Sequence, residues 1–215
     1  MPEQFGFLKG HQIFDAVGAA QEGLHTIKTK GIKARLLKID LIKAYDRVDW
    51  GYLWLLLLHI GLEWRTVEWI MACICNVNFS VLVNGSPSTF FQGSRGLRQG
   101  CPLSPLLFLL IIEGLSCSIS MAKSHGEIPG VKLLAHQILS HLFFVDDVLL
   151  FGMICTKEWD KFHELVINFY GATDMEINFD KSCFISPLEV MDPSIHALFP
   201  IEHRKLDDGI KYLGY

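Results

Sequence analysis

The sequence has few features of a secreted or zinc-bound protein. Its six cysteines include no CxxC pair, and none lies near a histidine at zinc-finger spacing, which excludes a recognisable zinc motif. We expect these cysteines to be reduced core residues of an intracellular protein, in the nucleus or the cytoplasm. The first ten residues lack a basic head followed by an apolar core, so we expect no signal peptide and no secretion.

An excess of positive charge and a membrane-length apolar run are also absent. The chain carries 19 Lys and Arg against 23 Asp and Glu, a net charge of −4, which is the wrong sign for holding nucleic acid by bulk electrostatics. The longest apolar runs, residues 53–58 and 106–112, are far shorter than the roughly 20 residues of a membrane span, so no membrane anchor is expected. With 215 residues, 50% of them hydrophobic, we expect a sizeable core, or apolar surface that packs on protein outside this chain.

The most informative stretch is HLFFVDDVLLF, residues 141–151. Its two apolar arms predict two short strands, with Asp146 and Asp147 at the turn of a hairpin. Two buried carboxylates are costly unless a cation compensates them, and a divalent metal prefers such oxygen ligands. Because Asp is also a common turn residue, this stretch alone leaves open a plain turn that faces water.

Upstream, residues 34–41 predict a strand that places a third carboxylate, Asp40, at its end. Asp49 is expected to cap the next helix, and Asp46 to have a local role, either in a turn or in an ion pair with Arg47. The other predicted elements are helices over 13–30, 50–60, 64–76, 106–118 and 157–170, a hairpin at Asn84-Gly85, a glycine-rich loop over 93–105, and strands over 177–186 and 209–215. Lys181 is expected within the first of these two strands or at its turn. Four tryptophans are expected in the core: Trp50, Trp54, Trp64 and Trp69.

Three carboxylates at the rim of one sheet would suit two Mg²⁺ ions and phosphoryl transfer. The 106 positions between Asp40 and Asp146 do not argue against a shared site, because distant strands can be neighbours in a sheet. The hypothesis is therefore a metal-dependent phosphoryl-transfer site at Asp40, Asp146 and Asp147.

The motifs, in this order, resemble the reverse transcriptase domain of non-LTR (LINE-type) retroelements, those of plants most of all. The resemblance covers nearly the whole chain and outweighs the plain-turn alternative. KIDLIKAYDRVDW resembles the first palm motif, GLRQGCPLSP the second, FVDD the YADD/FADD box, INFDKS the fourth motif and KYLGY the start of the primer-grip element. The sequence departs from the family pattern at His11, where Arg is common, and at Val145, where Ala is usual.

The resemblance implies a role for each matched residue. Asp40 and Asp146 would bind two Mg²⁺ ions, or Mn²⁺ in their place, and Asp147 would complete the carboxylate set. Lys181 would lie near the triphosphate as a candidate general acid. The reaction would be attack of a primer 3′-hydroxyl on a dNTP.

Substrate contacts are implied in the same way. Tyr45 would stand under the incoming sugar and reject a 2′-hydroxyl. Gln99 and Gly100 would lie along the nascent pair and the template, with Arg98 beside them. The implied partners are an RNA template, a DNA primer, dNTPs, and the fingers and thumb of a parent polyprotein.

The implied fold is α+β, a right-hand polymerase palm with an antiparallel sheet backed by helices, partial fingers and no thumb. The expected divisions are 1–31 (partial fingers), 32–50 (palm), 51–97 (fingers and palm helices with a hairpin), 98–205 (palm) and 206–215 (start of the primer grip). Without fingers and thumb the chain is expected to be inactive alone. The alternatives are a non-catalytic remnant that keeps the fold, and another two-metal phosphotransferase or nuclease, for which Tyr45 and the Gln99 loop have no use.

Overall fold

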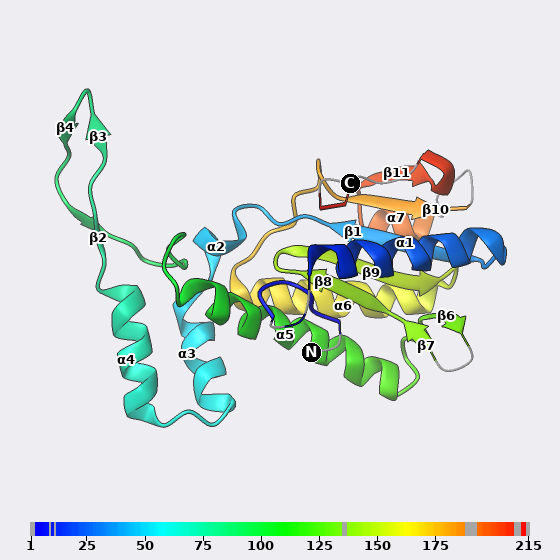
Figure 1. Cartoon of the computed structure of the whole chain (residues 1–215), viewed down its shortest axis with the longest axis horizontal. Coiled ribbons are helices and arrows are strands. Elements are labelled where there is room, and N and C mark those ends of the chain that lie inside the picture. The colour runs from blue at the N-terminus through cyan, green and yellow to red at the C-terminus, as the bar shows by residue number, and fades with distance from the viewer. Residues whose placement is uncertain are drawn as a thin grey trace.

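The computed structural model describes residues 3–8, 10, 12–134, 137–187, 193–208 and 212–213. At its centre is a five-stranded sheet in the order β11-β10-β1-β9-β8, antiparallel except for the β10-β11 pair (Figure 1). The strands are β1 (Ala34–Ile39), β8 (His141–Phe144), β9 (Asp147–Met153), β10 (Cys183–Ser186) and β11 (Glu202–Lys205). The predicted α+β class with an antiparallel-rich sheet is confirmed.

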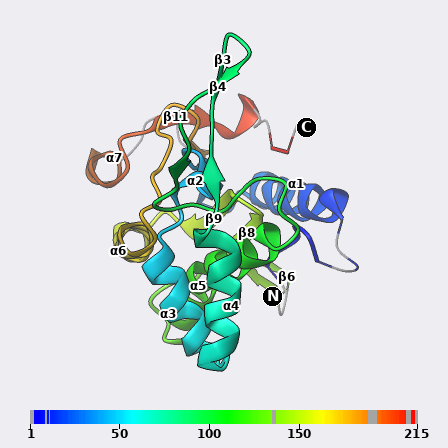
Figure 2. The ribbon, with the colours of Figure 1, turned by 90° about the vertical axis from the view of Figure 1, so that its left-hand side faces the viewer.

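The sheet is covered by helices on both faces (Figure 2). Successive residues of a strand point to opposite faces, so one residue of each adjacent pair enters each core. Leu37 and Leu150 join the larger core with helices α5 (Ser104–Ser124) and α6 (Thr156–Thr173). Leu36 and Leu149 join a second core under helix α1 (Ile13–Thr29). The continuous apolar runs of β1 and β9 therefore reflect burial on both sides.

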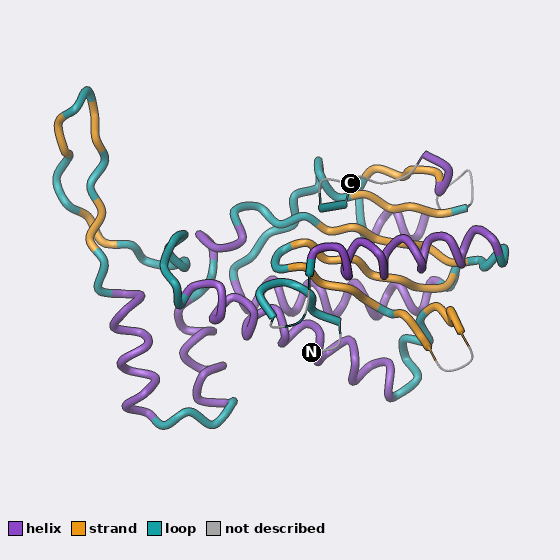
Figure 3. The backbone as a smooth tube through the Cα atoms, viewed as in Figure 1, coloured by secondary structure: helices purple, strands orange, loops and turns teal. Residues whose placement is uncertain are grey.

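An arm projects from one end of the sheet (Figure 3). It comprises helices α3 (Trp50–His59) and α4 (Trp64–Cys75) and a long hairpin in which β2 (Asn78–Phe79) pairs with β5 (Phe91–Gln92) and β3 (Leu82–Val83) with β4 (Ser86–Pro87). A hairpin is present at Asn84-Gly85, where one was predicted, and these two residues, both with positive φ, form its turn. The remaining elements are α2 (Ala44–Arg47), β6 (Val131–Leu134), β7 (Gln137–Leu139), α7 (Pro193–Leu198) and η1 (Leu206–Asp208).

Several sequence predictions are wrong in the structure. Trp64 and Trp69 are 56% and 70% exposed because α4 lies on the projecting arm, away from the sheet. Of the six cysteines only Cys183 is buried. The strand predicted over 177–186 begins only at β10, because residues 179–181 form a turn. His11 and most of the strand predicted over 209–215 lie outside the described residues, and the predicted divisions into palm and fingers stay predictions.

Among the described residues, α5 alone is long and apolar enough to cross a membrane, judged by length and composition. The core helix of a water-soluble protein meets the same criterion. Half of the most apolar window of α5 is buried inside the protein. Leu107, Ile111 and Leu115 of this helix lie in the larger core, where α5 packs against α3 and α6. We therefore interpret α5 as a core helix.

Candidate active site

The predicted carboxylates meet at one end of the sheet. Ile39, the last residue of β1, pairs with Val148 of β9 in antiparallel register. One step further along the two strands come Asp40 and Asp147, which are therefore neighbours across the strands. Asp40 is close enough to raise the pKa of both Asp146 and Asp147 through charge repulsion. The expected convergence of the early strand and the later hairpin is present.

The turn of the hairpin lies one residue earlier than predicted. Phe144 pairs with Asp147, so the two turn residues are Val145 and Asp146, and Asp147 begins β9. Val145 has φ of 58°, in the left-handed region that β-branched residues rarely adopt. Asp146 is thereby carried at the tip, while Asp147 lies on the sheet.

The electrostatics of the hairpin favour a bound cation. Loss of water around Asp147 raises the pKa of its carboxyl to about 6, although the Lys38 ammonium, 3.9 Å away, lowers it. Loss of water is also the main reason that the pKa of Asp146 is raised, and Asp40 adds to the rise. Crowded carboxylates of this kind are stabilised in the ionised form by a nearby cation.

A turn that follows α6 fixes the backbone of Asp40. The amide of Asp40 donates to Oγ of buried Ser182 at 3.0 Å, and its carbonyl accepts from the amide of Asn178 at 2.8 Å. Lys181 lies in the same turn and is exposed. The described part of the cleft lining does not include Lys181, although it neighbours the residue that holds Asp40.

A cleft of about 500 Å³ lies beside the hairpin. It brings three of the four predicted substrate residues to the carboxylates. The described lining residues are Phe7, Tyr45, Gln99, Gly100, Ser104, Pro105, Phe144, Val145, Asp146, Asp147 and Leu213. Segments separated by more than a hundred residues therefore share one surface.

The ring of Tyr45 is held as a flat wall of this cleft. It stacks on Phe108 of α5 with ring centroids 4.5 Å apart and planes 11° apart. Burial, and secondarily the charge of Asp146, raises the pKa of Tyr45 to about 12, so the phenol stays neutral near pH 7. A rigid aromatic wall next to the carboxylates can exclude groups by shape.

The glycine-rich loop that carries Gln99 packs on the segment that follows Asp40. The amide of Leu97 donates to the carbonyl of Tyr45 at 2.6 Å, and the amide of Gly96 donates to the carbonyl of Val48 at 2.8 Å. Gly96 has φ of 89°, and a Cβ there would lie 2.5 Å from the carbonyl oxygen of Asp46. Only glycine fits this approach.

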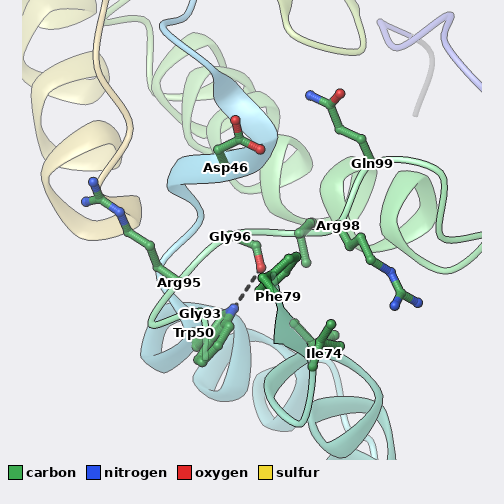
Figure 4. A pocket seen from close by; sticks show the side chains of 11 residues that line it. Asp46, Trp50, Ile74, Phe79, Gly93, Arg95, Gly96, Arg98 and Gln99 are labelled. Carbon is green, nitrogen blue, oxygen red and sulfur yellow. Dashed lines mark hydrogen bonds between the residues drawn. The ribbon is translucent and has the colours of Figure 1, made fainter. Parts of the chain in front are cut away.

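Arg98 points elsewhere. Figure 4 shows it on a second pocket, of about 250 Å³, whose lining includes Trp50. There the Trp50 Nε1–H donates to the carbonyl of Gly96 at 2.8 Å. Of the two roles predicted for Asp46, the ion pair with Arg47 is wrong, because the Arg47 guanidinium pairs with Glu176 and donates to the carbonyl of Asp174. The local role fits, because the Asp46 amide donates to the carbonyl of Lys43 at 2.9 Å.

Sequence reasoning missed three supporting residues: Lys38 beside Asp147, Phe108 under Tyr45, and Ser182 behind Asp40. Lys38 had a usable signal, because it precedes Asp40 by two positions and so shares its face of the strand. Phe108 and Ser182 are brought to the site by tertiary packing.

The carboxylates fit a divalent metal in donor type and charge. Within the described ranges, no group of three His, Cys, Asp or Glu side chains is arranged so that it could hold a metal ion. Mg²⁺ is usually held by one or two carboxylates together with substrate phosphates, so an open arrangement is what such a site requires.

The sheet, its carboxylates at one end and the adjoining aromatic residue and glycine-rich loop have the architecture of a right-hand polymerase palm. The sequence model described as "Reverse transcriptase (RNA-dependent DNA polymerase)" matches residues 1–215. The chain therefore belongs to the reverse transcriptase family, whose members generally use divalent metals.

Similar proteins include products of non-LTR retroelements. The chain is 29% identical over 182 residues to the transposon TX1 uncharacterized 149 kDa protein of Xenopus laevis, covering 84% of this chain and 14% of that protein. It is 25% identical over 203 residues to the Pol polyprotein of the type-1 retrotransposable element R2 of Popillia japonica, covering 88% of this chain and 32% of that one. The chain thus spans less than a third of either relative.

The fold is similar to that of solved telomerases. Telomerase from Candida albicans, in complex with a fragment of telomeric RNA, matches with a TM-score of 0.62 at 16% identity, over 85% of this chain and 31% of that one. Apo telomerase from Candida tropicalis, truncated from its C-terminal domain, also gives 0.62, at 13% identity, over 89% of this chain and 37% of that one. The predicted polymerase fold is confirmed.

Proposed function

We propose that this chain is the palm-containing part of an RNA-directed DNA polymerase that adds dNTPs to a primer 3′-hydroxyl. The observation that carries the proposal is the meeting of Asp40 with Asp146 and Asp147 beside a cleft walled by Tyr45 and Gln99. A nuclease has no use for the last two residues, so this combination favours polymerisation.

Asp40 and Asp146, with Asp147, would hold two Mg²⁺ ions, or Mn²⁺ in their place. The bound metals would assist attack of the 3′-hydroxyl on the α-phosphate and neutralise charge on the departing pyrophosphate. Lys181 would donate a proton to that leaving group, which requires its exposed side chain to reach the triphosphate. Before metal binds, Lys38 partly balances the charge of Asp147.

The substrate would lie along the cleft. Tyr45, fixed on Phe108, would form the wall against which a 2′-hydroxyl clashes. Gln99 and Gly100 would contact the nascent pair and the template, with Arg98 beside them on the second pocket, which Gln99 also lines.

The proposed partners are an RNA template, a DNA primer and the rest of a parent polyprotein that supplies fingers and thumb. The chain covers 32% of the R2 polyprotein, which leaves room for those parts. Its net charge of −4 also suggests that the basic surface that holds nucleic acid lies in other segments. We propose that the chain is inactive alone, and localisation inside the cell stays a prediction.

The test is Asp146→Asn in the intact protein that contains this chain, assayed by Mg²⁺-dependent primer extension on an RNA template. We expect a loss of about 10³-fold or more, because charge stabilisation by a held metal contributes several kcal/mol to such reactions. Asp160→Asn, an exposed position on α6, is the matched control and should extend like the parent. Equal extension by the Asp146 variant and the parent would contradict the proposal. No extension by the intact parent would favour the non-catalytic remnant.

A further inference from the structure

The segment before α1 lies along the edge of the active-site hairpin. The amide of Phe5 donates to the carbonyl of Phe143 at 2.9 Å, and the amide of Phe143 donates to the carbonyl of Glu3 at 2.8 Å. Gln4, between them, forms a parallel bridge with Phe143 of β8. Residues 3–5 therefore extend the sheet beside β8, the strand that leads into the turn at Val145 and Asp146.

Gln4 turns its side chain into the protein beneath that turn. The side chain is fully buried, with 0% exposure. Its Oε1 accepts from the amide of Gly6 at 2.8 Å and from the amide of Val145 at 3.3 Å. One buried amide oxygen thus joins the segment before α1 to the turn, across 141 positions of sequence.

Val145 is a residue that needs such support. Its left-handed φ of 58° is unfavourable for a β-branched side chain, and it is buried. In a two-residue hairpin the ladder closes at the flanking pair, here Phe144 and Asp147, so the Val145 amide makes no ladder bond. Gln4 is the partner that satisfies it.

Gly6 also packs closely against Val145. A Cβ at Gly6 would lie 2.5 Å from Cγ2 of Val145 and 3.0 Å from its amide nitrogen. Gly6 therefore confines the Val145 side chain, and the acceptor on Gln4 fixes the Val145 backbone.

We propose that Gln4 is a positioning residue of the polymerase reaction, because its buried amide oxygen holds Val145 in the left-handed conformation that presents Asp146 and Asp147 to the cleft. This inference rests on the proposed function. Gln4 touches no reacting group and acts only through the turn.

The kinetic test is Gln4→Met in the intact protein, which keeps the side-chain length and removes the acceptor. Misplaced carboxylates should lower kcat by about 10- to 100-fold, with KM for dNTP changed less than about threefold. Gln21→Met, the same change at an exposed position of α1, should leave both constants at parent values. A parent-like kcat for the Gln4 variant would overturn the proposal.

Coupling to Val145 distinguishes positioning from general support of the fold. Glycine adopts positive φ without help, so in the Val145→Gly background Gln4→Met should lower kcat by less than about threefold. An undiminished loss in that background would mean that Gln4 acts by another route, and would overturn the proposal.

Hydrogen exchange tests the same contact without catalysis. In Gln4→Met the Val145 amide should exchange about tenfold faster or more, while amides in the middle of α6 keep their parent rates. Unchanged exchange at Val145, or equal acceleration in α6, would overturn the positioning role. If the intact parent extends no primer, the proposed function fails, and the exchange result still decides whether Gln4 holds the turn.

Discussion

Acidification should weaken the fold through His141, a buried histidine that plays no part in the proposed chemistry. The imidazole is fully buried at the start of β8, with Nε2 3.0 Å from Oγ of Ser116 and Nδ1 3.0 Å from Oγ of Ser140. Burial, and secondarily the charge of Lys123, lowers the pKa of His141 to about 3. The folded protein therefore keeps this ring neutral.

The direction of the pH effect follows from proton linkage. An unfolded histidine has a pKa of about 6.5. At pH values between this pKa and the lower pKa of folded His141, the unfolded chain therefore binds more protons than the folded chain. The stability contributed by neutral His141 is present above pH ~6.5 and is lost as the pH falls towards the folded pKa. Between about pH 7 and about pH 5 the loss amounts to about 2 kcal/mol.

Titration of Asp147 changes stability in the opposite direction, so its contribution must be separated from that of His141. Its raised pKa of about 6 means that the folded state takes up a proton first. The same linkage makes acidification over this range favour folding by about 1 kcal/mol at Asp147. The net pH dependence of the parent is therefore smaller than the His141 contribution.

The assay is urea unfolding of the chain and of His141→Gln at about pH 7 and about pH 5. The variant keeps Asp147 and lacks the titrating ring, so the parent should lose about 2 kcal/mol more than the variant. His25→Gln, at an exposed position on α1, should follow the parent. The same pH dependence in the parent and His141→Gln would refute the reasoning, because the buried ring would then not be held neutral.

Three further predictions, each with a comparison variant, test the site and its supports. Tyr45→Val should raise ribonucleotide incorporation by about tenfold or more in primer extension by the intact protein, while Tyr45→Phe should not; unchanged discrimination would remove Tyr45 from sugar selection. Gly96→Ala should lower the free energy of unfolding in urea by about 2 kcal/mol or more, because its Cβ would clash with the Asp46 carbonyl. Gly100→Ala, also at positive φ but in open space, should lower it by about 1 kcal/mol. Asp49→Ala should cost about 1 kcal/mol in the same measurement and Asp49→Asn much less, because Asp49 accepts the Tyr52 amide at 2.6 Å as the α3 cap.

Local signals in the sequence were sufficient for most elements. Apolar spacing predicted 13–30, 50–60 and 64–76 as helices, and the structure has α1, α3 and α4 within two residues of those bounds. Asp49 has the cap role expected of it. These signals succeed because a helix period or a cap depends on residues a few positions apart.

Several predictions that depended on distant packing failed, although the convergence of Asp40 with the Asp146-Asp147 hairpin is present. The strand patterns alone placed both carboxylates of the Asp-Asp pair in the turn, whereas pairing with Phe144 draws Asp147 into β9. The partner of Arg47 is Glu176, 129 positions away, and not its neighbour. Gln4 offered no signal at all, because its meaning depends on the conformation of a residue 141 positions later. No local pattern encodes such contacts.

The placement of the carboxylates follows from the pattern that builds the two cores. Val148 and Ile39 pair and both enter the larger core, while Leu149, opposite Lys38, faces the core under α1. Asp147, two residues before Leu149, shares its face, and so lies diagonally across from Lys38. A one-residue slip of β9 against β1 would turn Asp147 towards α5 and α6 and Val148 away from them. The apolar residues of β9 therefore hold the register of the site as well as the core, which is why so few polar contacts are needed to bring Asp40 and the hairpin together.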